Sequence, residues 1–135
     1  MIRIQELKAG DYVIVDNDGD RKRGEVVELN VGSKQVCVNN GVQDFWYEME
    51  QLSPIPIDDA HLSQLQFHKQ LNDDGTVKYS KGAFRMVTPA DGDFSRMELW
   101  YRDEHRHINQ HIYLHQLQNH FYEMTKVHLD DTNFD

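Results

Sequence analysis

The chain has 135 residues, of which 39% are hydrophobic, and it carries a formal net charge of −9. This length fits one compact domain or two small ones that share an interface, and the aromatic and hydrophobic content is typical of a globular rather than a disordered protein. Acidic residues exceed Lys and Arg in both halves of the chain. The composition therefore argues against a broad phosphate-binding surface, and nucleic acid is not an expected partner.

Compartment and covalent chemistry are also limited by the sequence. Cys37 is the single cysteine, which excludes an internal disulfide and a cysteine-based zinc site. The first residues contain no apolar run like that of a signal peptide, and no stretch is apolar enough to span a bilayer. We expect a cytoplasmic protein that does not contact a membrane and needs no cofactor, and a homo-oligomer is compatible with these features.

The N-terminal half has the pattern of a small all-β unit. Asp18-Gly19 and Asn40-Gly41 have the chemistry of tight hairpin turns, and they separate segments rich in β-branched and aromatic residues. The five strands predicted here are Asp11 to Val15, Gly24 to Leu29, Gln35 to Val38, Val42 to Glu48 and Gln51 to Ser53. Because so short a sheet must curl to bury one face, we predict an SH3-like or Tudor-like β-barrel over residues 1–55.

Four aromatic residues in this half are candidates for a binding surface. They are Tyr12, Phe45, Trp46 and Tyr47. One interpretation is that they line a peptide groove or a cage for a methylated cation. The other is that Phe45 and Tyr47 share one face of a strand, with Trp46 on the opposite face, and that one of these faces is the core.

Two charged segments near the first turn suggest ligands. Asp16 to Asp20 has the composition of a calcium loop, but an EF-hand needs Gly and Glu where this chain has Arg21 and Val27. Arg21 to Arg23 is the one basic cluster, and it directly follows three aspartates. We interpret it as a solvated hairpin end, with nucleic-acid binding as a weaker alternative.

Pro54 and Pro56 mark the start of a second part, residues 56–135, because proline stiffens an extended connector. Asp58 is placed to cap a short helix from about Asp59 to Gln66. The strands predicted after it are Thr76 to Ser80, Ala83 to Val87, Met97 to Arg102 and His107 to Ile112. They form an antiparallel sheet with one side partly exposed to water.

The most regular pattern in the chain lies between Ile112 and Met124. Leu114, Leu117, Phe121 and Met124 recur at helical spacing and form one apolar stripe. We predict a helix from Leu114 to about Lys126 that covers the second sheet. The fold class is therefore α+β, with a small N-terminal β-barrel followed by an antiparallel sheet under a C-terminal helix.

Three segments carry a family resemblance. They are Leu7 to Val13, Leu52-Ser-Pro-Ile-Pro-Ile57, and the helix motif His115-Gln116-Leu117-Gln118-Asn119 with Phe121, Tyr122 and Thr125 after it. These resemble a family of small uncharacterised proteins of Bacteroidota and their prophages, with a central LSPIPL and a terminal YVHQLQNLYFALTG. Lys126 replaces the family's glycine, and His120 replaces an apolar residue. The resemblance implies a phage or mobile-element setting and no activity.

Histidines are concentrated near this motif. If the helix includes His111, then His111 and His115 lie at i and i+4, the spacing of two zinc ligands. The alternative is that residues up to Ile112 form a strand and His115 is a structural residue bonded to backbone. Cys37 lies in an apolar run that raises its pKa, and no nucleophile motif is present.

These observations favour a non-enzymatic accessory module that binds another protein. A metal-dependent enzyme that uses the C-terminal histidines is the second hypothesis, and a nucleic-acid-binding module is the third.

Overall fold

The computed structural model describes residues 2–132. Its strands form two antiparallel sheets, and the chain divides into two compact units. The first unit is Met1–Pro56 with Tyr113–Asn119, and the second is Ile57–Ile112 with His120–Asp135. The protein is therefore α+β and mostly β, with a C-terminal helix.

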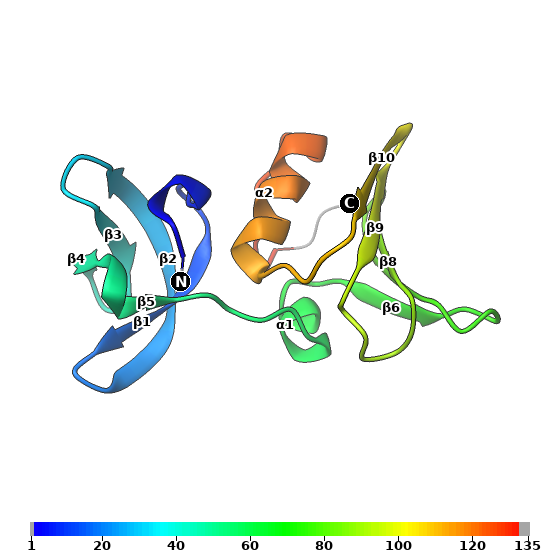
Figure 1. Ribbon diagram of the computed structural model, residues 1–135, viewed down its shortest axis with the longest axis horizontal. Helices are drawn as coiled ribbons and strands as arrows, with labels where there is room; N and C mark the ends of the chain where they lie inside the picture. Colours follow the sequence, from blue (N-terminus) through cyan, green and yellow to red (C-terminus); the bar gives the residue numbers. More distant parts are fainter. Residues whose placement is uncertain (1, 133–135) are drawn as a thin grey trace. The chain divides into compact units, whose positions relative to one another are not determined.

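The first unit is built from a short N-terminal turn and five strands (Figure 1). In chain order these are η1 (Ile4–Glu6), β1 (Tyr12–Asn17), β2 (Asp20–Asn30), β3 (Gln35–Asn39), β4 (Asp44–Glu48), η2 (Met49–Gln51) and β5 (Leu52–Ser53). The strand order β4-β3-β2-β1-β5 leaves β4 and β5 at opposite edges with no pairing between them, so the described residues form no closed barrel.

Alternation along the strands decides which side of this sheet is the core. Val13, Val26, Val36 and Tyr47 point to one side and are almost completely buried. Gly24 lies in the same layer, where an added Cβ would come within 2.4 Å of the Val38 side chain. Glycine is therefore required at this close approach of β2 to β3.

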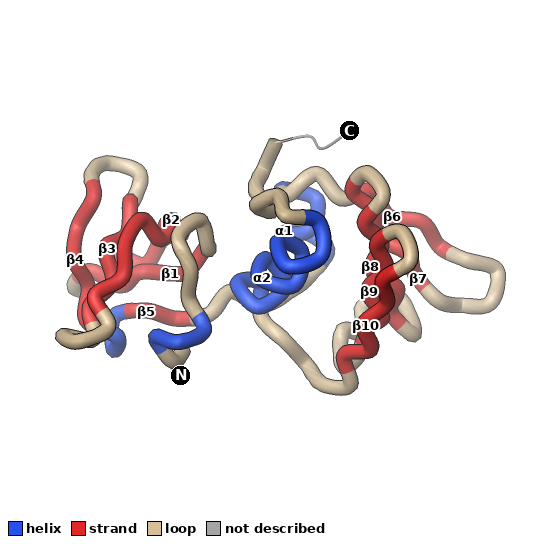
Figure 2. Tube along the Cα trace, turned by 90° about the horizontal axis from the view of Figure 1, so that it is seen from above, coloured by secondary structure: helices blue, strands red, loops and turns tan. Residues whose placement is uncertain are grey.

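The second unit contains α1, five strands and the later part of α2. Its elements are α1 (Asp59–Gln64), β6 (His68–Leu71), β7 (Val77–Lys81), β8 (Phe84–Thr88), β9 (Met97–Tyr101) and β10 (Glu104–Ile108). The sheet is a simple meander, β10-β9-β8-β7-β6. Within this unit α1 and the later part of α2 lie on one side of the sheet, as Figures 1 and 2 show.

Two predictions about this unit need correction. Strand β6 was not expected, because His68–Leu71 has no apolar side and its four residues are exposed. The last strand was expected from His107 to Ile112 but is Glu104–Ile108, since Glu104 pairs with Tyr101 across a tight turn. The cap of α1 is confirmed, because the Asp58 carboxylate accepts a hydrogen bond from the His61 amide.

The C-terminal helix α2 (Leu114–Thr125) confirms the predicted apolar stripe, since all four stripe residues are buried. In the second unit Phe121 packs on Phe84 of β8, with ring centroids 4.8 Å apart. Residues Tyr113–Asn119 instead belong to the first unit, so only the later part of the helix belongs with the second sheet. The replacement of an apolar residue by His120 suggested an exposed position, but His120 is half-buried and contacts the Arg106 guanidinium at 2.9 Å.

Lys126 ends α2 in the left-handed conformation that the missing glycine would have favoured. Its φ is 63°, and its amide donates to the Tyr122 carbonyl at 2.7 Å. The helix therefore keeps this type of cap although lysine occupies the position.

Candidate functional site

The four aromatic candidates do not lie together on one open surface. Tyr47 is completely buried, and its hydroxyl accepts a hydrogen bond from the Asn40 amide at 3.1 Å. Tyr12 is buried, with the Arg23 guanidinium 4.4 Å from its ring centroid. Phe45 and Trp46 are the exposed pair, at 44% and 40% exposure. A cage that uses all four rings is therefore not formed, and Tyr12 and Tyr47 act as core residues.

Phe45 and Trp46 lie on opposite sides of β4, as the alternation predicts. Phe45 packs edge-on against Tyr47, with centroids 5.1 Å apart, at the margin of the core. Trp46 pairs with Cys37 on β3, which pairs in turn with Glu28 on β2, so these three side chains form one row on the solvent side. Strand β4 is thus an edge strand with an exposed aromatic residue on each face.

Carboxylates surround Trp46 on this side of the sheet. The row beside it is Glu25, Asn39 and Asp44, and the row on the other side is Asn30, Gln35 and Glu48. We call the surface formed by Glu25, Glu28, Asp44, Trp46 and Glu48 the acidic face. None of its four carboxylates forms an ion pair within the described part of the chain. These four carboxylates are therefore not held in ion pairs, and they make the surface around Trp46 acidic.

The carboxylates of the acidic face affect the pKa of the Cys37 thiol. Burial raises its pKa first, and the nearby charges of Asp44 and Glu28 raise it further. The predicted unreactive thiol is confirmed in direction, because a raised pKa leaves less thiolate at neutral pH. The acidic face had no distinct signal in the sequence, since its carboxylates come from two strands, β2 and β4, that are not neighbours in the chain.

The helix motif has a structural explanation. Gln118 accepts a hydrogen bond from the Tyr12 amide at 2.8 Å and donates to the Gly10 carbonyl at 3.1 Å. Asn119 donates to the Glu6 carbonyl at 2.8 Å. The Leu114 amide donates to the Ile55 carbonyl at 2.8 Å. Polar groups of α2 therefore bind the N-terminal segment of the first unit, and Ile55 contacts the start of the same helix.

Asp11 is a buried acid inside this joint. Its carboxylate accepts from the Lys8 amide at 2.9 Å and from the Asn119 side chain at 3.4 Å. Burial outweighs these bonds and raises the pKa of Asp11 to about 7. This was not predictable from the sequence, because Asp11 was expected at the start of the first strand, where an aspartate is commonly solvated.

The histidine predictions have mixed outcomes. Helix α2 begins at Leu114, so His111 precedes it and the helical i, i+4 pair with His115 does not exist. His115 is 1% exposed, and neither ring nitrogen has a hydrogen-bond partner among the described residues, although Nε2 lies 3.5 Å from a Glu6 oxygen. The expected bond to backbone is therefore wrong. Burial lowers the pKa of His115 and favours the neutral ring.

The possible metal ligands among the described residues do not form a cluster. Within residues 2–132, no cluster of three or more His, Cys, Asp or Glu side chains has the geometry of a metal site. The predicted basic cluster is also mixed in charge, because Arg21 pairs with Asp16 across the β1–β2 hairpin.

The second sheet holds residues that were not singled out from the sequence. On the side away from α1, register places Arg85, Trp100 and His105 in one row, with Lys78, Glu98 and His107 beside them. The sequence analysis predicted a partly exposed side of this sheet but not these partners, because they come from four strands.

Among the described residues, no helix is long and apolar enough to cross a membrane. No family model matches the chain, and neither the curated proteins nor the solved structures include a match to it.

Proposed function

We propose that this protein is a non-enzymatic module that binds an extended, basic segment of another protein along strand β4. The observation that carries this proposal is the exposed pair Phe45 and Trp46 on an edge strand next to unpaired carboxylates. The family resemblance supports an accessory role in a phage or mobile element. The small five-stranded antiparallel sheet of the first unit, in which β5 pairs with β1, supports an SH3-like or Tudor-like class for it.

Strand β4 has the features of a strand that accepts another. It pairs with β3 on one side only, so its outer backbone groups have no strand partner. Proteins normally protect such edges with charges, prolines or bulges in the strand, whereas the centre of β4 is Phe45-Trp46-Tyr47. An added peptide strand would satisfy the backbone and contact Trp46 and Phe45 with alternate side chains.

The acidic face sets the chemistry of that partner. A Lys or Arg side chain on the Trp46 side of the peptide would contact the indole face and lie close to Asp44, with Glu28 further along the same row. An acidic peptide would be repelled there. Alternating basic and apolar residues are therefore the expected pattern.

A fluorescein-labelled peptide of alternating Lys and Val, measured by anisotropy, tests the proposal. We expect Trp46→Ala to weaken its binding by about tenfold, which is the cost of losing a central aromatic contact. Leu71→Ala is the matched control, because Leu71 is also an exposed apolar residue on an edge strand, β6. It should leave peptide binding unchanged.

Two further probes separate strand addition from simple charge attraction. The same peptide with alternate amides N-methylated should lose binding if backbone hydrogen bonds form, and a Glu/Val peptide should not bind. Equal binding of the Lys/Val and Glu/Val peptides, or equal affinity of the Trp46→Ala and parent proteins, would overturn the proposal.

A further inference from the structure

The second unit carries a solvent-facing surface whose charge is opposite to that of the acidic face. It consists of two adjacent rows that cross β7 to β10. One row is Ser80, Arg85, Trp100 and His105, and the other is Lys78, Val87, Glu98 and His107. We call these rows, together with Arg96 at their end, the basic face. In the second unit α1 and the later part of α2 lie on the opposite side of the sheet.

The cations of this face are not held in ion pairs, although Asp93 lies near Arg96. Lys78, Arg85 and Arg96 form no ion pair within the described residues, and Arg85 Nε has no hydrogen-bond partner there. Glu98 is the single carboxylate in the two rows. Its Oε1 atom is already 3.1 Å from His105 Nε2 and 3.6 Å from His107 Nδ1. The charge left over is positive, and it suits an anionic ligand.

Planar groups are arranged across the first row. His105 stacks on Trp100 with centroids 3.9 Å apart and an interplanar angle of 21°, and the Arg85 guanidinium lies 6.0 Å from the Trp100 ring. His105 lies on the edge strand β10, so its outer ring face is at the sheet margin. A further flat ring can continue this stack.

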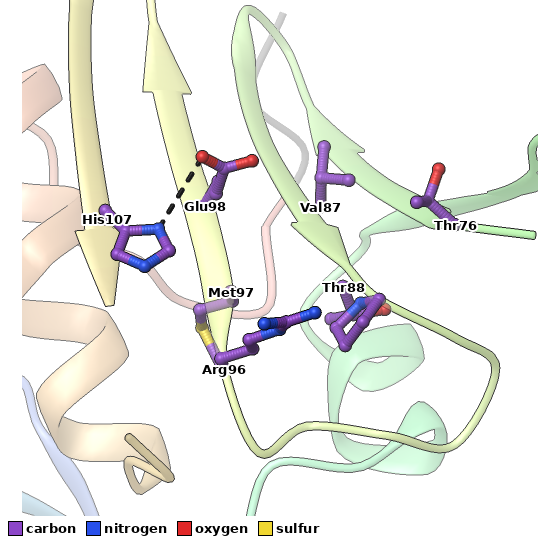
Figure 3. Close-up of a pocket in the computed structure, with 8 residues that line it drawn as sticks. Thr76, Val87, Thr88, Arg96, Met97, Glu98 and His107 are labelled. Carbon is purple, nitrogen blue, oxygen red and sulfur yellow. Dashed lines mark ion pairs between the residues drawn. The ribbon is translucent and has the colours of Figure 1, made fainter. Parts of the chain in front are cut away.

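A pocket of about 270 Å³ adjoins the second row (Figure 3). Its walls combine apolar groups, such as Val87 and Met97, with Arg96, Glu98 and His107. Figure 3 shows the Arg96 side chain reaching toward Thr88 at the rim. The volume suits one small planar group rather than a large ligand, since pockets for drug-sized molecules usually start at about 300 Å³.

We infer that the basic face binds single-stranded nucleic acid. One unpaired base would occupy the pocket, another would stack on His105, and phosphates would lie along Arg96, Lys78 and Arg85. Unpaired bases and phosphates together match a surface that offers rings, a small pocket and cations, whereas an acidic peptide would use the cations alone. A duplex hides its base planes and would bind less well.

Fluorescence anisotropy with a labelled single strand of about twelve nucleotides, long enough for such a surface, tests the inference. Binding should weaken by about tenfold in Arg96→Gln and in Arg85→Gln, and it should fall steeply as salt is raised. Arg96 is exposed, so its replacement does not threaten folding. Arg21→Gln is the matched control, because Arg21 is an exposed arginine in the first unit, and it should bind like the parent.

The competing outcomes are each informative. Labelled polyglutamate that binds as tightly as the single strand would overturn the inference in favour of an acidic peptide. The same is true of a duplex that binds better, of a loss seen in Arg21→Gln instead, or of no binding at low salt. Failure of the Lys/Val peptide to bind would leave this result unaffected, because the two experiments use different residues and probes.

Discussion

The two sheets share an architecture and differ in the charge of their solvent sides. Each has five antiparallel strands, a buried apolar side and a tryptophan on the opposite side. Around Trp46 the neighbours on the solvent side are Glu25, Glu28, Asp44 and Glu48, whereas around Trp100 they are Lys78, Arg85, His105 and His107, with Glu98 as the one carboxylate. The core side of a sheet is set by hydrophobic alternation, but its solvent side is free to take either charge.

This difference shows why net charge is a weak guide to partners. The formal charge of −9 argued against nucleic acid for the whole chain. The register nevertheless gathers cations from separate strands into one face, and a local field rather than the total decides which ligand can approach. Four kinds of change test this comparison. They are removal of a buried core side chain under the acidic face, a change of pH, reversal of the charges on one face, and replacement of the residue that ends α2.

Tyr47→Ala should have the largest effect. The ring is completely buried, supports Phe45 and holds the Asn40 side chain, so we expect a loss of about 3–5 kcal/mol in the free energy of unfolding. Urea denaturation measures it. The affinity for the Lys/Val peptide should also fall, because the buried Tyr47 ring holds β4 against the core of the first unit. A loss under about 1 kcal/mol would contradict the assignment of Tyr47 to the core.

Asp11→Asn tests the buried acid of the first unit. The pKa of Asp11 is raised from 3.8 to about 7 by burial, so its contribution to stability is full below about pH 4 and is lost as pH rises through 7. Asparagine carries no charge there, and we expect it to stabilise the protein at pH 8 by up to about 4 kcal/mol and to change little at pH 4. Urea denaturation at both values measures this.

Asp59→Asn in the second unit is the control with the opposite sign. Hydrogen bonds from the Tyr79 hydroxyl and the Lys69 ammonium lower the pKa of Asp59, so its contribution exists above 3.8 and is lost as pH falls. The Asp59→Asn variant should therefore have a lower free energy of unfolding than the parent at pH 8. In both proteins burial lowers the pKa of His115, so protonation of this residue reduces stability as the pH falls below 6.5. A stability of Asp11→Asn that matches the parent at pH 8 would show that Asp11 is not held as a buried charge.

Charge reversal compares the two faces directly. Glu28→Lys combined with Asp44→Lys should weaken binding of the Lys/Val peptide by about tenfold, because it replaces attraction beside Trp46 with repulsion. The same protein should keep the single-strand affinity of the parent. Lys78→Glu should give the reverse pattern. Anisotropy with both probes measures all four combinations, and parallel losses in either variant would mean that the faces do not act separately.

Much of the fold was predictable because it depends on local patterns. The helix stripe, the Asp58 cap and most strands follow from periodicity and turn chemistry near each residue. Strand β6 and the open edges of the first sheet were not predictable, since an exposed strand has no hydrophobic period and sheet closure depends on pairing between distant segments.

The candidate sites were harder to predict for the same reason. Trp46 was found as an aromatic residue, but its carboxylate neighbours come from β2 and β4, and Arg85 meets Trp100 only through the register of β8 and β9. Burial removes Tyr12 and Tyr47 from the candidate binding surface and raises the pKa of Asp11 to about 7. None of these properties belongs to a residue type or a spacing alone.

Lys126→Gly should give the smallest effect, a gain of about 1 kcal/mol in the free energy of unfolding. Lys126 has a φ of 63°, where a side chain is strained and glycine is not, and its amide closes the end of α2. Gly75→Ala is the matched control of opposite sign, because Gly75 has a φ of 92° and an added Cβ there meets nothing within 4 Å. Both sites have a positive φ, so the urea midpoint should rise in the first variant, which removes a side chain, and fall in the second, which adds one. A lower midpoint in Lys126→Gly would mean that the lysine side chain contributes more to the helix end than its left-handed backbone costs.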